Sequence, residues 1–332
     1  MIARFPPPPH PVTATPIHIG PHRLQSPFAL APMAGLTDVP FRTLAWRYGA
    51  GYMVSEMVSS KPELWESGKS RLRRVPVPGV TPVAVQIAGS DPQSLAESAR
   101  RHVDDGVDVI DINLGCPAKK VCRKAAGSAL LNDLDLVARI VEATARAVSV
   151  PVTVKTRTGV EAGDGMAAEI ARVVTDSGAQ LLVMHARSRA CRFVGAVDYA
   201  AVRSAVEATS IPVLVNGDIK SAAGVRHALA MSGAAGVMIG RGAFGRPWLF
   251  QELLENSCPS WQQKWTVIAE HLHAMHEFYG EPMGVRIARK HIEAYCNELS
   301  VDWQGFARLE SAVEQQNWVR AAAQQNDEAQ AA

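Results

Sequence analysis

Short apolar runs alternate with segments of helical periodicity from residue 28 to residue 241. The intervening segments, such as 91–106, repeat apolar side chains at the spacing of one helix face. Uninterrupted apolar runs in this alternation are typical of buried parallel strands. The runs number eight and lie at residues 28–33, 51–57, 82–87, 107–113, 150–157, 180–187, 211–217 and 236–241.

Eight strand–helix units favour a (β/α)8 TIM barrel of the α/β class, whose usual size is ~250 residues. A doubly wound parallel sheet is the competing fold, and the number of runs favours the barrel. We expect the barrel to span residues 16–250, with a short hairpin formed by 15–20 and 23–28.

The strand pattern stops after Trp248, and three amphipathic helices are predicted at 261–279, 284–299 and 303–321. Residues 251–322 are therefore expected to form a C-terminal α-helical domain. Residues 1–15 contain consecutive prolines, which exclude helix and strand pairing and predict a disordered leader. The polar residues 323–332 predict a disordered tail.

Composition limits the classes of function. The chain has 332 residues, with 34 basic against 32 acidic, so its total charge does not indicate nucleic-acid binding. No apolar run approaches the ~18 residues of a membrane span, and the N-terminal segment lacks a signal-peptide core. Five cysteines match no zinc-site spacing and indicate reduced thiols. We expect a cytoplasmic protein without a metal, a membrane or a stable protein partner.

Nearly every predicted strand ends in a polar residue, and in a barrel the carboxyl ends of the strands carry the chemistry. Asn216-Gly217-Asp218 and Gly240-Arg241 end the last two strands, where glycine backbone N–H groups can approach a phosphate. Lys155 would hold a cation against a flavin ring, while Gln86 and His185 would contact the ring edge. Together these residues fit flavin mononucleotide (FMN).

Cys116 follows a strand end and precedes Pro117, so it is expected in a loop at the catalytic pole. A thiol of reference pKa ~8.5 is mostly protonated at neutral pH and can act as an acid. Cys122 is left without a role.

Basic residues follow three of the predicted strands and indicate a polyanionic substrate. A predicted C-terminal helix, 284–295, extends this basic track. The clusters comprise Arg71, Arg73 and Arg74; Lys119, Lys120, Arg123 and Lys124; Arg187, Arg189 and Arg192; and Arg286, Arg289 and Lys290.

The chain resembles the tRNA-dihydrouridine synthases, most closely the bacterial DusB subgroup. The resemblance rests on motifs that run in family order from about residue 17 to 295. They include APMAGLTDVPFR (31–42), DINLGCPAKKV (111–121), VKTRTG (154–159), HARSRACRF (185–193), IGRGAFGRPW (239–248) and GVRIARKHIEAY (284–295). Ala186 stands where the family usually has glycine, and the chain beyond Trp303 matches poorly.

The resemblance implies an FMN barrel followed by a helical domain that helps to hold tRNA. Cys116 matches the family's proton donor, and Pro32, Met33 and Ala34 would join the FMN contacts named above. The expected substrate and tRNA contacts are Asn113, Lys119, Lys120, Arg123, Lys124, Arg157, Arg187, Arg286, Arg289 and Lys290.

The implied reaction is reduction of uridine in tRNA, at a D-loop position, to 5,6-dihydrouridine. NADPH, in preference to NADH, would reduce FMN, the flavin would pass hydride to C6, and Cys116 would protonate C5. One alternative is an FMN barrel that acts on free pyrimidines and resembles dihydroorotate dehydrogenases. Another is a tRNA-binding chaperone that has lost catalysis.

Overall fold

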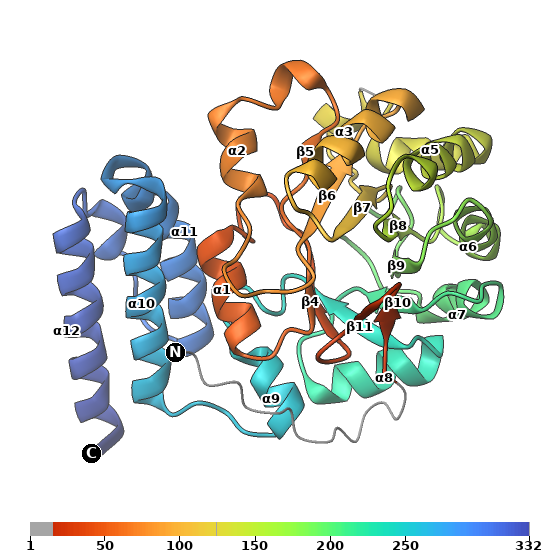
Figure 1. Ribbon diagram of the computed structural model, residues 1–332. Helices are drawn as coiled ribbons and strands as arrows, with labels where there is room; N and C mark the ends of the chain where they lie inside the picture. Colours follow the sequence, from red (N-terminus) through yellow and green to blue (C-terminus); the bar gives the residue numbers. More distant parts are fainter. Residues whose placement is uncertain (1–15, 124, 332) are drawn as a thin grey trace.

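The computed structural model describes residues 16–123 and 125–331. A parallel sheet in the order β4-β3-β11-β10-β9-β8-β7-β6-β5 forms the wall of a barrel (Figure 1). Its strands are β3 Phe28–Leu30, β4 Tyr52–Met53, β5 Val58–Ser59, β6 Ala84–Ala88, β7 Val109–Asn113, β8 Val152–Arg157, β9 Leu181–His185, β10 Val213–Asn216 and β11 Gly236–Ile239.

The second barrel strand is divided into two pieces, β4 and β5. Each piece pairs with a different neighbouring strand, and together they close the ring. β4 pairs with β3, whereas β5 pairs with β6. Val54, which lies between the two pieces, also bridges to Ala84 at the start of β6. All eight predicted runs therefore contain strand, and the predicted (β/α)8 barrel is confirmed.

Helices on the outside of the barrel cover the apolar face of the sheet (Figure 1). Several begin at an Asp or Ser whose side chain accepts a backbone N–H of the first turn, as Asp38, Asp91 and Asp133 do. The helices are α1 Val39–Arg47, α2 Gly68–Arg74, α3 Pro92–Asp104, α4 Lys119–Cys122, α5 Leu134–Ala147, α6 Ala167–Asp176, α7 Tyr199–Glu207, α8 Ala222–Ser232 and α9 Leu249–Glu255.

The predicted hairpin is present as β1 His18–Ile19 and β2 His22–Arg23. Ile19 is fully buried and belongs to the cluster that fills the barrel interior, together with residues such as Val109 and Leu214. Gly20 lies against Pro151, which precedes β8. The hairpin therefore covers the amino-terminal end of the barrel and leaves the opposite end for the site.

Three long helices follow the barrel: α10 Trp261–Tyr279, α11 Glu281–Leu299 and α12 Ala312–Ala331. They stand together beside α1 (Figure 1). Their own apolar cluster contains Leu272, Ile292 and Tyr295, and it takes in Leu44 of α1 and Trp248 of the barrel's last segment. Burial of these two side chains fixes the helical layer against the barrel.

The bounds of the third predicted helix, 303–321, differ from those of α12, which begins and ends later in the chain. A short 3-10 turn, Phe306–Arg308, packs the fully buried Phe306 into the helical core, so α12 begins only at Ala312. The predicted disordered tail, 323–332, is helical through Ala331, and the strong helix propensity of alanine and glutamine accounts for this. The predicted leader, 1–15, lies outside the described residues.

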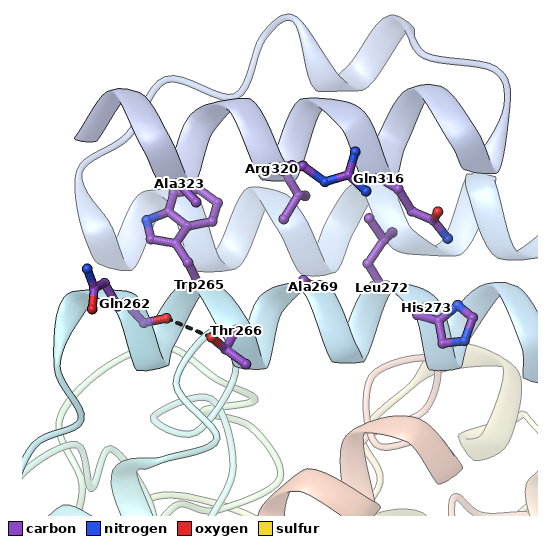
Figure 2. A pocket seen from close by; sticks show the side chains of 10 residues that line it. Gln262, Trp265, Thr266, Ala269, Leu272, His273, Gln316, Arg320 and Ala323 are labelled. Atoms are coloured by element: carbon purple, nitrogen blue, oxygen red, sulfur yellow. Dashed lines mark hydrogen bonds between the residues drawn. The ribbon is translucent and has the colours of Figure 1, made fainter. Parts of the chain in front are cut away.

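A cavity of about 450 Å³ lies between α10 and α12 (Figure 2). Figure 2 shows Trp265, Leu272 and Ala323 at its wall, with Thr266 donating a hydrogen bond to the carbonyl of Gln262. Its lining residues all come from the two helices. Because no strand end contributes to it, this cavity is a feature of helix packing and is separate from the barrel site.

Removal of a fully buried leucine from the barrel interior should destabilise the protein. We expect Leu181→Ala to lower the free energy of unfolding by about 2–5 kcal/mol, because the lost contacts leave a cavity. Leu64→Ala is the matched control, since Leu64 is 38% exposed and should tolerate the change. Thermal unfolding followed by circular dichroism checks both variants, and equal losses would contradict the packing described here.

Candidate active site

A cavity of about 470 Å³ opens at the carboxyl ends of the barrel strands. Its residues belong to β6, β7, β8, β9 and β10 or to the segments that follow β3, β4, β7, β9, β10 and β11. Its lining includes Cys116, Asn113, Arg157 and every residue predicted to contact the cofactor: Pro32, Met33, Ala34, Gln86, Lys155, His185, Asn216, Gly217, Asp218, Gly240 and Arg241. The alternation of strands and helices thus places residues far apart in sequence around one space.

A chain of buried hydrogen bonds crosses neighbouring strands beneath this cavity. Asp111 is fully enclosed and accepts from Gln86 Nε2 at 2.7 Å and from Thr153 Oγ1 at 2.6 Å. Asn113 Nδ2 in turn donates to Gln86 Oε1 at 2.8 Å. Burial raises the pKa of Asp111 to about 6, against the opposing effect of these donors. The chain therefore fixes the orientation of both amide side chains.

Asn113 also holds the loop that carries Cys116. Its Oδ1 accepts the backbone N–H of Gly115 at 3.2 Å and that of Cys116 at 2.9 Å. The carbonyl of Cys116 accepts from Ser128, both from Oγ at 3.0 Å and from the backbone N–H at 3.1 Å. The cysteine is thus fixed at its nitrogen and at its carbonyl.

Gly127 allows the backbone before Ser128 to pass close to the Cys116 carbonyl oxygen. Its φ is +63°, and a Cβ at this position would lie 2.7 Å from the Cys116 carbonyl oxygen. Any larger residue would push the loop away.

The Cys116 thiol is half-buried, and burial raises its pKa. It is therefore held in the protonated form at neutral pH, as an acid requires. Cys122 lies nearby, and its Sγ is 3.6 Å from the Cys116 carbonyl oxygen.

Lys155 and His185 occupy the floor of the cavity in different charge states. Lys155 Nζ donates to Asn216 Oδ1 at 3.3 Å, and burial, followed by repulsion from Arg157, lowers the Lys155 pKa to about 8. Burial and the nearby cations lower the pKa of His185 to about 2, so its imidazole is neutral. The floor therefore offers one cation and one neutral ring.

The segments at the ends of β10 and β11 form one part of the cavity wall. Gly217 has a φ of +135°, and its carbonyl accepts from Tyr199 OH at 2.6 Å. Asp218 pairs with Arg241 at 2.7 Å, and Arg241 remains more than half exposed. Hydrogen bonding from Arg187 lowers the pKa of Asp218 to about 2. This part of the wall combines a glycine that lines the cavity with an exposed arginine.

Two arginines expected to contact tRNA are committed to the protein itself. Arg187 has a side chain only 3% exposed and pairs with Asp218 at 2.5 Å, so it is held within the protein, and its role as a tRNA contact stays a prediction. Arg157 lines the cavity, but it donates to the carbonyls of Gly115, Ser188 and Arg192 at 2.6–2.9 Å. Buried arginines need such partners, and the sequence alone does not reveal them.

The other predicted basic contacts that the structure describes lie at α4 or on α11. Lys119 and Arg123 are exposed at α4, the side chain of Lys120 is not described, and Lys124 lies outside the described residues. Arg286 is exposed on α11, whereas Arg289 donates to the Leu309 carbonyl at 3.0 Å. Lys290 approaches Gly35 in the loop after β3.

An aromatic residue that was not predicted from the sequence also lines the cavity. Phe193 lines the cavity, is 55% exposed, and has the Arg157 guanidinium 5.2 Å from its ring centroid. Its position within the motif 185–193 was the available signal, but a single aromatic residue carries no spacing pattern. An exposed aromatic side chain beside a cation provides a stacking surface for a planar ring.

A family model described as dihydrouridine synthase (Dus) matches residues 29–329, which include the barrel strands and α12. The chain belongs to the dihydrouridine synthase family. The predicted family resemblance is therefore confirmed.

Relatives in several bacteria extend the match over most of the chain. It is 48% identical to the tRNA-dihydrouridine synthase B of Pseudomonas syringae pv. tomato, over 85% of this chain and 86% of that protein. Identity to the Escherichia coli K12 protein of the same name is 46%, over 90% of this chain and 95% of that protein. These values support the predicted subgroup.

Solved structures share the fold at low sequence identity. Morphinone reductase gives a TM-score of 0.53 at 13% identity, over 75% of this chain and 91% of that chain. Histamine dehydrogenase from Rhizobium sp. 4-9 gives a TM-score of 0.54 at 14% identity, over 79% of this chain and 51% of that chain.

The part of the chain that the structure describes contains no helix with the length and apolar character of a membrane span.

The protonated state of Cys116 can be tested by alkylation. Because the thiolate is the nucleophile, we expect iodoacetamide at neutral pH to modify the exposed Cys258 faster than Cys116. The Cys116 rate should keep rising at alkaline pH, above the range of an ordinary thiol. Buried Cys296, whose pKa burial raises to about 12, serves as the slow control in peptide mass spectrometry. If Cys116 is instead modified faster than Cys258 at neutral pH, its thiol is ionised, and it could not be the protonated acid.

Proposed function

We propose that this protein reduces uridine in tRNA to 5,6-dihydrouridine, with Cys116 as the proton donor to C5. The observation that carries the proposal is the loop of Cys116, which Asn113 and Ser128 hold at the wall of the cavity. The loop fixes the proposed acid at the wall of a cavity of about 470 Å³, which is large enough for a pyrimidine. The names of the bacterial relatives support tRNA as the substrate.

The cavity fits FMN as the cofactor. Gly217 and Gly240 line it without a side chain, and Arg241 supplies exposed donors for a phosphate. Lys155 is a buried cation whose pKa is lowered, so an anionic partner would stabilise it. When bound, reduced FMN would supply the hydride that uracil C6 accepts.

The residues of the chain divide the remaining tasks. Cys116 holds the proton for C5, and its raised pKa keeps that proton in place until the base is beside it. Gln86 and Lys155 would orient the cofactor, and Asn113 would keep the acid in line with it. Neutral His185 can contact a ring without adding a second positive charge.

The finer assignments follow the family resemblance. NADPH, in preference to NADH, is the proposed reductant, the D-loop carries the proposed target, and the cytoplasm is the proposed location. Residues 251–322 would help to hold tRNA, with exposed Arg286 on α11 as a proposed contact. Extraction of the target base from its stack costs a few kcal/mol, which contacts with the tRNA backbone would offset.

A barrel acting on free pyrimidines is the second candidate that the cavity volume permits. Such an enzyme would not need exposed cations outside the pocket, yet Lys119, Arg123 and Arg192 are all exposed in the segments that follow β7 and β9. These cations favour the tRNA substrate.

Loss of the proton donor should abolish most of the reaction but spare reduction of the cofactor. We expect Cys116→Ala to lower the rate of dihydrouridine formation by about 10²- to 10⁴-fold, the usual contribution of a positioned general acid. Dihydrouridine is measured in tRNA by mass spectrometry, and NADPH oxidation is followed separately. Cys258→Ala is the control, because Cys258 is exposed and lies outside the cavity. Wild-type rates in Cys116→Ala would refute the assigned role.

Removal of the buried cation should weaken the flavin site. We expect Lys155→Met to retain less FMN on purification and to bind added FMN at least about tenfold more weakly, because a charge-assisted contact is lost. Visible absorbance of the purified protein and a flavin titration measure the two effects. Lys69→Met, at an exposed position on α2, is the matched control. Equal FMN content in both variants would place the cofactor away from Lys155.

A further inference from the structure

A second concave surface adjoins the active-site cavity on the side of the Cys116 loop. It has a volume of about 470 Å³ and shares Pro117 with the first cavity. Its lining comes from the segments after β7, β8 and β9, and comprises Pro117, Lys119, Cys122, Asn132, Val160, Glu161, Arg189, Ala190 and Arg192. The surface is mainly polar, and it borders the residue that follows the proposed acid.

Three cations in this lining have no anionic partner among the described residues. Within residues 16–123 and 125–331, the side chains of Lys119, Arg189 and Arg192 form no ion pair. Arg157 and Arg187, by contrast, are bonded within the protein. Glu161 is the one carboxylate of the lining, so the cavity carries excess positive charge. Uncompensated cations in a concavity concentrate a positive potential that attracts an anion.

The backbone that carries these cations is fixed. Asp164 accepts the N–H groups of Val160 and Glu161 at 2.7 and 2.9 Å. The N–H of Arg189 donates to the Gly159 carbonyl at 2.9 Å. Two loops of the cavity wall are therefore tied to each other.

Arg192 connects this wall to the Cys116 loop. Its backbone is left-handed, with a φ of +50°, a conformation that is costly for a residue with a side chain. In this conformation its carbonyl accepts from Arg157 Nη1 at 2.6 Å, while Arg157 Nε donates to the Gly115 carbonyl at 2.7 Å. A group bound beside Arg192 would thus be held at a set position relative to Cys116.

We propose that this second cavity binds a backbone phosphate of tRNA next to the uridine being reduced, and that Lys119, Arg189 and Arg192 are its ligands. The inference rests on the proposed function. A base protonated by Cys116 must lie against the Cys116–Pro117 loop, so its own sugar–phosphate chain leaves along that loop. A phosphodiester is the anion that such a chain presents, and paired arginine and lysine donors suit its oxygens. The site would pull the extruded nucleotide into register with the acid.

Steady-state kinetics with an unmodified tRNA transcript test the proposal in the FMN-loaded enzyme. We expect Lys119→Ala and Arg189→Ala each to raise the KM for tRNA by about tenfold or more, because each removes a charge-assisted contact. The slope of log KM against log salt concentration should fall by about one for each contact removed. Arg172→Ala, an exposed position on α6, is the matched control and should keep both values.

Other outcomes overturn the proposal. An unchanged tRNA KM and an unchanged salt slope in both variants, with a folded protein by circular dichroism, would show that no phosphate binds there. A raised KM for NADPH with an unchanged tRNA KM would assign the cavity to the dinucleotide instead. If the wild-type enzyme forms no dihydrouridine and binds no tRNA, the proposed function itself fails, so the two failures are distinguishable.

Discussion

The hydrogen bonds that start at Asp111 are the constraint on which the site depends. This carboxyl group is enclosed in the barrel, where an unsatisfied polar group costs several kcal/mol. Its two oxygens are satisfied by Gln86 and Thr153 from the strands on either side, and Gln86 passes the constraint to Asn113. Because Asn113 then holds the backbone at Cys116, the position of Cys116 follows from the register of β6, β7 and β8. A shift of one residue in that register would break the whole chain of bonds.

The sequence was sufficient to predict which residues meet, because barrel topology brings every strand end to one pole. It was also sufficient for the helices α10 and α11, whose apolar periodicity is strong. The boundary of α12 was not predictable, because a helical pattern continues through the segment in which Phe306 is buried by tertiary packing. The split between β4 and β5 was likewise not predicted, since β5 lies just beyond the apolar run 51–57 and is defined by its pairing with β6.

The arginines show the limit of sequence reasoning most clearly. Arg187 and Arg192 both lie in the segment 185–193, and composition gives no reason to treat them differently. In the structure one is buried against Asp218, while the other is exposed at the rim. What separates them is the direction of each side chain from a looping backbone, which depends on tertiary contacts rather than on residue type. A basic cluster in sequence can therefore contain both cations that are bonded within the fold and cations that stay exposed.

The helices α10 and α11 also contact the barrel next to the cavity, at the loop that follows β3. Tyr279, at the end of α10, donates to Asp38 at 2.9 Å, and Asp38 caps α1 directly after the loop that contains Met33. Burial raises the pKa of Asp38 to about 6, so at neutral pH its carboxylate is ionised and gains from Tyr279 and from nearby Lys290. Lys290 itself reaches Gly35 of that loop. The barrel and the helices are thus joined at the loop that lines the cavity, so the orientation of the helical layer relative to the pocket is fixed.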